Sequence, residues 1–438
     1  MDTVQNYENL KDTLAQASND RGEPHWFTAR RLAAVDQMVD LPLPEVQRFD
    51  YHRWPVTPTE QGLKHVRSNK KLAANVDIRE DSVQITQVGQ TTISTNLPDD
   101  LFDQGVILTD IFTAFREHPR LTQKYFMDKV INTGEDRLTS YHTAFLNAGI
   151  FLFVPKGVTI KQPIEAHIIQ DSTQRAPLVS HVLIIAEEDS HFSFIQHLTT
   201  QGDQKNLASC VVEILARANS HVGFSSLDEF GHNTTTYLNR RAYLSRDANV
   251  DWAIAMMNDG NTIADFDSEL VGSGSKADSK VVAITAGDQH NGINTRVTNR
   301  GKHTTGNILQ RGVIEEKSML IFNGIGSIIH GAHGANAEQE NRVLMMSDQA
   351  RGDANPILLI DEDDVIAGHA ASVGQVDAEQ LYYLMSRGID KKTAQRLVIR
   401  GFLGAVLIAV PSKAVRQRMI QTIERKLEHG QNTQTDQR

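Results

Sequence analysis

The chain has 438 residues, a formal net charge of −10, a hydrophobic fraction of 40% and a single cysteine, Cys210. At roughly 100–200 residues per domain this length predicts two to four folding units, and the hydrophobic fraction is enough for a packed core. The negative charge argues against a nucleic-acid partner, and one cysteine excludes both a disulfide framework within the chain and a metal site made of cysteines alone.

The chain shows no segment that directs it to a membrane or out of the cell. Its first residues, "MDTVQNYENLKDTL", are acidic and polar, unlike a secretory signal. The longest apolar run, "GFLGAVLIAVP" at 401–411, is shorter than the about 20 residues that a membrane-spanning helix needs. We therefore expect a cytoplasmic protein with no membrane partner.

Residues 1–84 are predicted to form an N-terminal helical region. Leu10, Leu14 and Ala17 lie at helical spacing, and a second helix should begin near Pro24 and end before the "PLP" at 42–44. A further helical insertion is expected near 99–140. Its apolar residues follow an amphipathic order and are Leu101, Phe102, Ile111, Phe112 and Phe115.

Residues 85–370 carry a repeat that predicts a right-handed parallel β-helix. Four similar stretches, "AEEDSHFSF", "ARANSHVGF", "SRDANVDWA" and "GSGSKADSK", place Ser190, Ser220, Ala248 and Ala277 at equivalent positions, 30, 28 and 29 residues apart. A fixed period of this length indicates stacked coils, in which inward apolar residues pack together and small residues occupy the corners. A β-sandwich with coincidental spacing is the alternative.

Residues 371–438 are predicted to return to helix. Asp377 can cap a helix that Gly388 ends, and a second helix should follow from Lys391. A last helix should begin after Pro411, and the residues that share its apolar face are Val415, Met419, Ile420, Ile423 and Leu427. Such helices can cover the end of a solenoid or present an apolar face to a partner.

Few residues suggest catalysis, and we expect no catalytic site. The acidic run Asp361–Asp364 alternates between the two faces of a strand, so it is more typical of a solvated turn than of a catalytic pair. His330 and His333 lie in a glycine-rich turn, and Cys210 lies in an alternating β-run, where a free cysteine is commonly a small buried hydrophobe. A β-helix lyase or hydrolase acting on carbohydrate remains the alternative, and it would need a groove lined with carboxylates.

His369 stands alone among small residues in "DDVIAGHAASVGQVDAEQLYYLMSRGI" at 363–389. This stretch resembles the C-terminal signature of the SufB/SufD family of iron–sulfur cluster assembly scaffolds. "HTAFLNAGIFLFVPKGV" at 142–158, "GKHTTGNILQRGVIEEKSMLIFNG" at 301–324 and "NAEQENRVLMMSDQA" at 336–350 resemble other parts of that family, so the resemblance covers most of the chain. It implies a parallel β-helix between two helical regions.

The resemblance also implies a role and partners. The absence of a cysteine after Cys210, and Ala370 in place of a glutamate, favour the SufD branch over the SufB branch. Members of the SufD branch pair with SufB through the edge of the β-helix and bind the ATPase SufC through C-terminal helices. His369 is then a candidate ligand for iron or a nascent cluster, held transiently and shared with SufB, with no cofactor bound stably in the isolated subunit.

Two points stay open at this stage. A homodimer is possible in isolation, because related subunits that pair can also pair with copies of themselves. Relatives often carry an acidic residue where this chain has Ala405, which leaves the details of the SufC contact undefined.

Overall fold

The computed structural model describes residues 2–66, 69–73, 76, 82–409 and 413–433. The helices are α1 Asp2–Asp20, α2 His25–Asp40, α3 Thr59–Gly62, the 3-10 helix η1 Lys70–Ala73, α4 Asp99–Asp103, α5 Ile111–Glu117, α6 Pro119–Tyr125, α7 Arg137–Phe145, α8 Ala378–Ser386, α9 Lys391–Ala409 and α10 Lys413–Thr433. Within these ranges no helix has the length and apolar character that crossing a bilayer requires.

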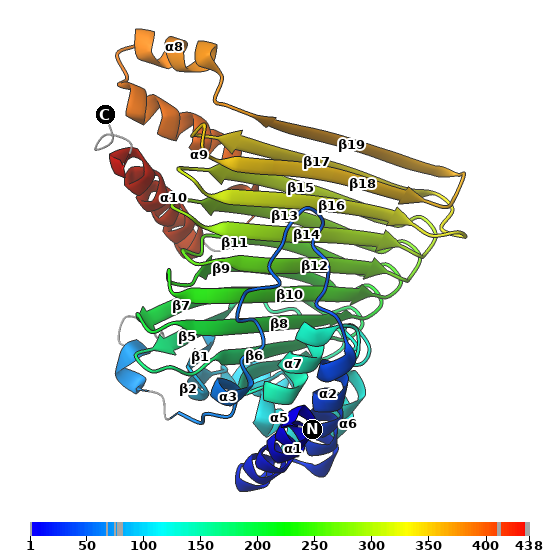
Figure 1. The fold of residues 1–438 in the computed structure, drawn as a ribbon. Coiled ribbons are helices and arrows are strands. Elements are labelled where there is room, and N and C mark those ends of the chain that lie inside the picture. Colours follow the sequence, from blue (N-terminus) through cyan, green and yellow to red (C-terminus); the bar gives the residue numbers. More distant parts are fainter. Residues whose placement is uncertain (1, 67–68, 74–75, 77–81, 410–412, 434–438) are drawn as a thin grey trace.

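The strands stack into a solenoid with two flat faces (Figure 1). They are β1 Val83–Val88, β2 Thr91–Asn96, β3 Ile107–Asp110, β4 Ala148–Val154, β5 Ile164–Ser172, β6 Leu178–Ala186, β7 His191–Gly202, β8 Asn206–Ala216, β9 His221–Glu229, β10 Thr234–Leu244, β11 Asn249–Met256, β12 Thr262–Leu270, β13 Lys276–Thr285, β14 His290–Asn299, β15 Thr305–Ile314, β16 Met319–Ile328, β17 Ala335–Met345, β18 Arg351–Ile360 and β19 Val365–Gly374.

Two sheets form the opposite walls of this solenoid. One, here the odd sheet, has the order β19-β17-β15-β13-β11-β9-β7-β5-β1-β2, and the other, the even sheet, has the order β18-β16-β14-β12-β10-β8-β6-β4-β3. From β4 onward each strand pairs in parallel with the strand two places later in the chain. This arrangement confirms the predicted parallel β-helix with helical regions at both ends, and it is incompatible with an antiparallel sandwich.

A column of left-handed turn residues explains the sequence repeat. The φ angles of this column lie between 56° and 72°, and its members in successive coils are Asp189, Asn219, Asp247, Gly274, His303 and Gly334. Asp, Asn and Gly adopt this region more readily than other residues. The amide N–H of each donates to a carbonyl of the next coil, so the turns are joined as the strands are.

The residue after each left-handed position is small and buried. The column consists of Ser190, Ser220, Ala248, Ser275, Thr304 and Ala335. The expected fourth member was wrong, because Ala277 pairs with Val250 and therefore points into the solenoid. The coil from Ala248 to Ser275 has 27 residues instead of the expected 29. Its two strands, β11 and β12, are also short, with 8 and 9 residues against 9 and 11 in β9 and β10.

Buried polar contacts hold the N-terminal helical region against the even sheet. His142 of α7 lies 3.3 Å from His181 of β6, which lies 3.1 Å from the carboxylate of Glu213 of β8. That carboxylate also accepts the backbone N–H groups of Met127 and Ile131, at 2.8 and 3.0 Å. All three side chains are fully buried, so the contact is part of the folded core. Burial raises the pKa of Glu213 to about 8 and lowers the pKa of both histidines.

A long connection at residues 41–58, here called the strap, crosses the outer side of the even sheet (Figure 1, dark blue). Phe49 packs against Gly292 so closely that a Cβ there would lie 2.5 Å from the ring. The side-chain amides of Asn294 and Asn323 donate to the strap carbonyls of Glu45 and Gln47, each at 3.3 Å. The strap therefore joins the N-terminal region to coils formed much later in the chain.

The stretch expected as a helical insertion near 99–140 contains a strand as well as helices. Its segment Ile107–Asp110 forms β3 and pairs antiparallel with β4. Pairing with a neighbouring strand overrides the amphipathic pattern, which is a weak local preference. The strands of the solenoid extend from Val83 to Gly374, against the expected range of 85–370.

The two ends of the solenoid differ. At the N-terminal end the sheets finish in β2 and β3, which run antiparallel to their neighbours. At the other end β18 and β19 are the outermost strands of the sheets and, within the described ranges, have no strand beyond them. Their exposed apolar side chains are Leu359, Ile360, Ile366 and Val373. An unpaired edge of this length can accept another chain.

Candidate functional site

His369 lies on β19, at the open end of the odd sheet. It pairs in register with Gln339 of β17, and paired residues of parallel strands point to the same side. Gln339 is buried and belongs to the inward-facing set of β17, so His369 continues an inward-facing column. It is nevertheless exposed, because no coil covers it, and its inward-facing neighbours on β19, Ala367 and Ala371, are small. The imidazole is thus accessible at the mouth of the solenoid.

The donor set around His369 does not complete a metal site by itself. In the ranges that the structure describes, no group of three His, Cys, Asp or Glu side chains is arranged so that it could hold a metal ion. Cys210 is buried in the core, where burial raises the pKa of its thiol to about 12, which confirms its expected role as a small hydrophobe. His369 can therefore supply one nitrogen ligand, and a metal held there needs further ligands from water or another chain.

The acidic run Asp361–Asp364 forms the turn that joins β18 to β19, as expected. Glu362 alone turns back toward the preceding coil, where it accepts the N–H of Gly331 at 2.8 Å. Its carboxylate lies 3.1 Å from His333 and 4.0 Å from His330. Both imidazoles are largely exposed, at 52% and 83% of the side chain. The cluster holds one turn against the next.

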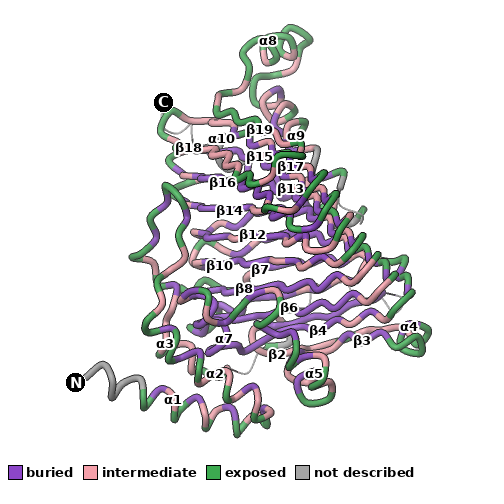
Figure 2. Tube along the Cα trace, turned by 90° about the vertical axis from the view of Figure 1, so that its right-hand side faces the viewer, coloured by how far each residue is buried: buried purple, intermediate pink, exposed green. Residues whose placement is uncertain are grey.

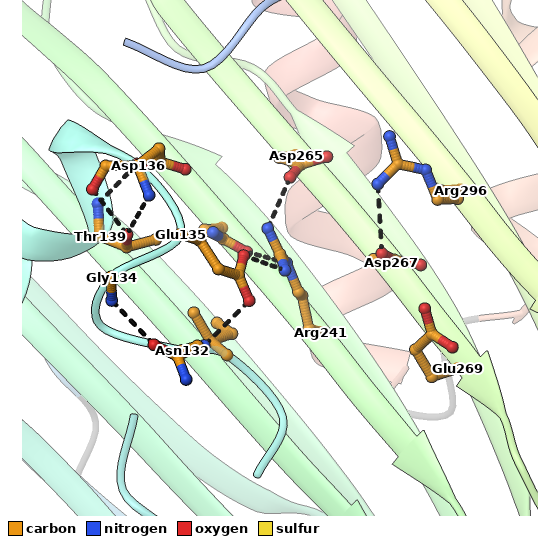
Figure 3. Close-up of polar contacts among 12 residues, drawn as sticks. Asn132, Gly134, Glu135, Asp136, Thr139, Arg241, Asp265, Asp267, Glu269 and Arg296 are labelled. Carbon is orange, nitrogen blue, oxygen red and sulfur yellow. Dashed lines mark hydrogen bonds and ion pairs between the residues drawn. The ribbon is translucent and has the colours of Figure 1, made fainter. Parts of the chain in front are cut away.

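A row of carboxylates does occur on the outer side of the even sheet (Figure 3). Asp265, Asp267 and Glu269 alternate along β12 and so share one side of the sheet. Asp265 lies 3.0 Å from Arg241, Asp267 lies 3.5 Å from Arg296, and Glu269 pairs with Arg300. Burial raises the pKa of Asp267 to about 7. Each carboxylate therefore faces an arginine, on β10 for Asp265, on β14 for Asp267 and just after β14 for Glu269.

Arg241 gives this row a structural role. Its guanidinium also binds Glu135 at 2.6 Å, in the loop that precedes α7 (Figure 3). The row therefore anchors the N-terminal region on the even sheet. Glycoside cleavage uses one carboxyl to give a proton and a second to attack or to activate water. Here all three carboxylates are paired with arginines, and Arg241 ties the row to the N-terminal region.

The C-terminal helices begin and end as the sequence predicts. Asp377 caps α8 by accepting the N–H groups of Glu379 and Gln380, at 2.7 and 3.3 Å. Gly388 follows in the left-handed conformation, with a φ of 89°. Of the described residues of α8, none is buried, and the helix projects from the open end of the molecule (Figures 1 and 2).

The apolar faces of α9 and α10 are covered. Met419, Ile423 and Leu427 of α10 pack with α9 against the outer side of the odd sheet, so this face is not free for a partner as the sequence suggested. The large apolar side chains that remain exposed on α8 and α9 are Tyr382, Tyr383, Met385, Leu397 and Ile408. The side chain of Ala405 lies outside the described residues.

Two sets of residues that matter for the arrangement of the later coils could not be found from the sequence. The first is the strap, whose contacts join residues that are 249 and 276 positions apart. The second is the pair of inward-facing amides beneath His369, Gln339 and Asn341. A period-2 alternation could have revealed the amides, but "NAEQENR" is polar at nearly every position and shows no such contrast.

Comparison with known proteins identifies the family. Residues 167–402 match the model described as "SUF system FeS cluster assembly, SufBD core domain", and residues 4–166 match "SufBD protein N-terminal region". The chain is 42% identical to "Iron-sulfur cluster assembly protein SufD" of Bacillus subtilis, over 95% of this chain and 98% of that protein.

More distant relatives agree with this result. SufBD family proteins of Staphylococcus saprophyticus and Staphylococcus aureus are each 24% identical, over 90% of this chain and 88% of the relative. The matches span both the helical region and the solenoid, and they confirm the resemblance found in the sequence. The chain belongs to the SufB/SufD family of iron–sulfur cluster assembly proteins.

Proposed function

We propose that this protein is a SufD-type scaffold subunit without turnover of its own, and that His369 holds iron or a nascent cluster transiently at an interface with a SufB-like subunit. The observation that carries the proposal is the accessible, inward-facing imidazole at an unpaired strand edge. An imidazole is a competent iron ligand, and one protein ligand with water or a thiolate from another chain makes a site that releases its cargo readily.

The open end of the solenoid supports pairing with another chain. β18 and β19 have ten residues each, and their outer edges carry unpaired backbone groups beside exposed apolar side chains. Such edges are templates for strand addition. A subunit of the same fold would extend both sheets across an approximate twofold axis, and a second copy of this chain would do the same in isolation.

The C-terminal helices support binding of a SufC-type ATPase. α8 has no buried residue among those described, and with the outer side of α9 it presents aromatic and aliphatic side chains to solvent. Aromatic residues are enriched among those that contribute most to binding at interfaces. α10, by contrast, uses its apolar face to pack on the odd sheet, so the proposed contact is made by α8 and the outer side of α9.

The test is co-expression of the chain with its SufB and SufC homologues, in wild-type form and as His369→Ala. The complex should assemble normally while its iron content and cluster absorbance fall several-fold, because one ligand to the metal has been removed. His330→Ala and His333→Ala are matched controls, since both imidazoles are exposed at the same end of the molecule. Normal cluster content in an intact His369→Ala complex would refute the proposed site.

A further inference from the structure

The column that ends in His369 changes character along the solenoid. Following the strand register through the odd sheet, its members are Phe194, Phe224, Trp252, Ser279, Ile308, Gln339 and His369. The neighbouring inward column runs from Gln196 and Ser226 through Ile254 and Val281 to Gln310 and Asn341, so polar side chains occur at both of its ends. The first column is therefore aromatic in the early coils and ends in an amide and an imidazole, whereas the second carries a buried amide in an early coil as well as in the last ones.

The amides of these columns are buried without a full set of partners in the described ranges, and those in the coil next to His369 are Gln339 and Asn341. Gln339 and Asn341 are 5% and 0% exposed. The Gln339 side-chain nitrogen donates to the carbonyl of Ile357 at 3.0 Å, but its oxygen has no hydrogen bond in the described part of the chain. Neither polar atom of the Asn341 side chain has one there either. Leaving buried polar groups unpaired costs about 1–3 kcal/mol each, so a bound ligand or water is expected to satisfy them.

The two amides converge on one point. A Cβ built on Gly324, in the facing sheet, would lie 2.5 Å from both the Asn341 nitrogen and the Gln339 oxygen. Gly324 therefore leaves room for both amide heads, directly below the coil that carries His369. The inward-facing side chains on either side of His369, Ala367 and Ala371, are small, so only short side chains cover the amides beside the imidazole.

We propose that Gln339 and Asn341 are positioning residues that accept hydrogen bonds from the water ligands of a ferrous ion held by His369. This inference rests on the proposed function. A single imidazole leaves most coordination positions of the ion to water or to a partner's ligands. Metal-bound water is a strong donor, and amide oxygens placed one coil below the imidazole are suitable acceptors. The substrate recognised here is thus the hydrated divalent iron ion.

A purely structural role for the amides predicts a different result. If Asn341 only filled space, Asn341→Leu would affect iron binding no more than the same change elsewhere in the interior. Asn291 provides that control, because it is 1% exposed, faces inward and also has a buried oxygen without a partner in the described ranges. Asn291 is far from the proposed site. It lies on β14, one coil below Gly324, whose register partner on that strand is Thr295. Asn291 is four positions from Thr295, which is about 13 Å along the strand.

The experiment is an anaerobic titration of the cluster-free, co-expressed complex with Fe²⁺, together with thermal unfolding of each variant. Asn341→Leu should raise the Kd for Fe²⁺ about 10- to 100-fold, as removal of outer-shell partners typically does. Its unfolding temperature should stay the same or rise, because a buried amide without partners is replaced by an apolar group of similar size. Gln339→Met serves as a second variant, and Asn291→Leu should bind Fe²⁺ normally.

The outcomes separate this inference from the proposed function. Normal Fe²⁺ affinity in both Asn341→Leu and Gln339→Met overturns the inference, and so does an equal loss of affinity in Asn291→Leu. If His369→Ala alone lowers the affinity, the proposed site stands and the role of the amides is rejected. If His369→Ala binds Fe²⁺ normally, the proposed function itself fails.

Discussion

Asp247 illustrates how single residues set the coil geometry. It occupies a turn with a φ of 56°, and its N–H donates to the carbonyl of Ser273 in the next coil. A left-handed residue costs an ordinary L-amino acid roughly 1–2 kcal/mol, and a β-branched side chain tolerates it least. The recurrence of Asp, Asn and Gly at this point in successive coils follows from that cost.

The first prediction compares two substitutions at this turn. Asp247→Val should lower the free energy of unfolding by about 1–2 kcal/mol, because valine is strained at positive φ. Asp247→Gly should change the stability by less, since glycine adopts this conformation without strain. Chemical denaturation of both variants measures the difference. Equal losses in the two variants would show that the side chain of Asp247, and not its backbone conformation, stabilises the turn.

Single residues also mark where sequence reasoning stops. His369 could be selected from its motif alone, and the structure places it at an accessible edge. Gln339 and Asn341 could not be selected, because their stretch is polar on both faces and only the strand register shows which side chains point inward. Ala277 was misassigned for a related reason: small residues occur both in corners and inside, and a two-residue change in coil length exchanges the two.

At the scale of elements, the contact of α7 with β6 and β8 depends on pH. Burial raises the pKa of Glu213 to about 8 from an ordinary value of 4.5. Between these values the folded state holds a proton that the unfolded state releases, so this residue lowers stability as pH rises, by up to about 1.4 kcal/mol per pH unit. His142 and His181 act in the opposite direction, because their lowered pKa values reduce stability as pH falls below about 6.5.

The second prediction uses the pH window above the range in which the two histidines of this contact lower stability, where Glu213 is the member of the contact that changes protonation. Between pH 6.5 and 8 the wild type should lose stability relative to Glu213→Gln, because glutamine has no proton to release. The variant should be less stable at pH 6.5, since its amide group accepts only one of the two backbone N–H groups. Thermal unfolding at several pH values measures the slope. Glu188→Gln, at an exposed position, should keep the wild-type dependence of stability on pH. If Glu213→Gln also keeps the wild-type dependence, the raised pKa of Glu213 is contradicted.

The C-terminal helices show what an apolar pattern can and cannot predict. The spacing of Met419, Ile423 and Leu427 correctly indicates one apolar face, but it does not reveal what covers that face. In this structure the outer side of the odd sheet covers it. Deleting the region to test partner binding would therefore expose the outer side of that sheet, so substitutions on α8 are the cleaner experiment.

At the scale of the whole molecule, the repeat length alone predicted the solenoid, because each coil has to return the chain to the same corner. The closed N-terminal end, the open C-terminal end and the strap could not be predicted in this way. They depend on contacts between segments that lie far apart in the sequence, such as Asn323 with Gln47. The position of β3 within a helical pattern is another case, since only its pairing with β4 makes it a strand.

The third prediction concerns the open end. Ile366 of β19 is 66% exposed, and Ile366→Lys should weaken pairing with a SufB-like subunit or with a second copy, because a lysine on an edge opposes strand addition. Sedimentation and co-purification with the partner measure the effect. Phe102→Lys is a matched control at the opposite end, where the phenylalanine is 67% exposed. Undiminished pairing of Ile366→Lys, or an equal effect of Phe102→Lys, would move the interface elsewhere.

The strap imposes an order on synthesis. Its apolar residues Val46 and Phe49 leave the ribosome long before Gly292 and Ile321, the surface on which they pack, have been made. At about 5–20 residues per second, that delay is on the order of 10–50 s. During this time the early coils can already stack, while the strap remains undocked and open to chaperones and proteases. Its docking on the later coils therefore follows the stacking of the early ones, and a chain interrupted before β14 would lack Gly292, Asn294 and Asn323, which the strap contacts there.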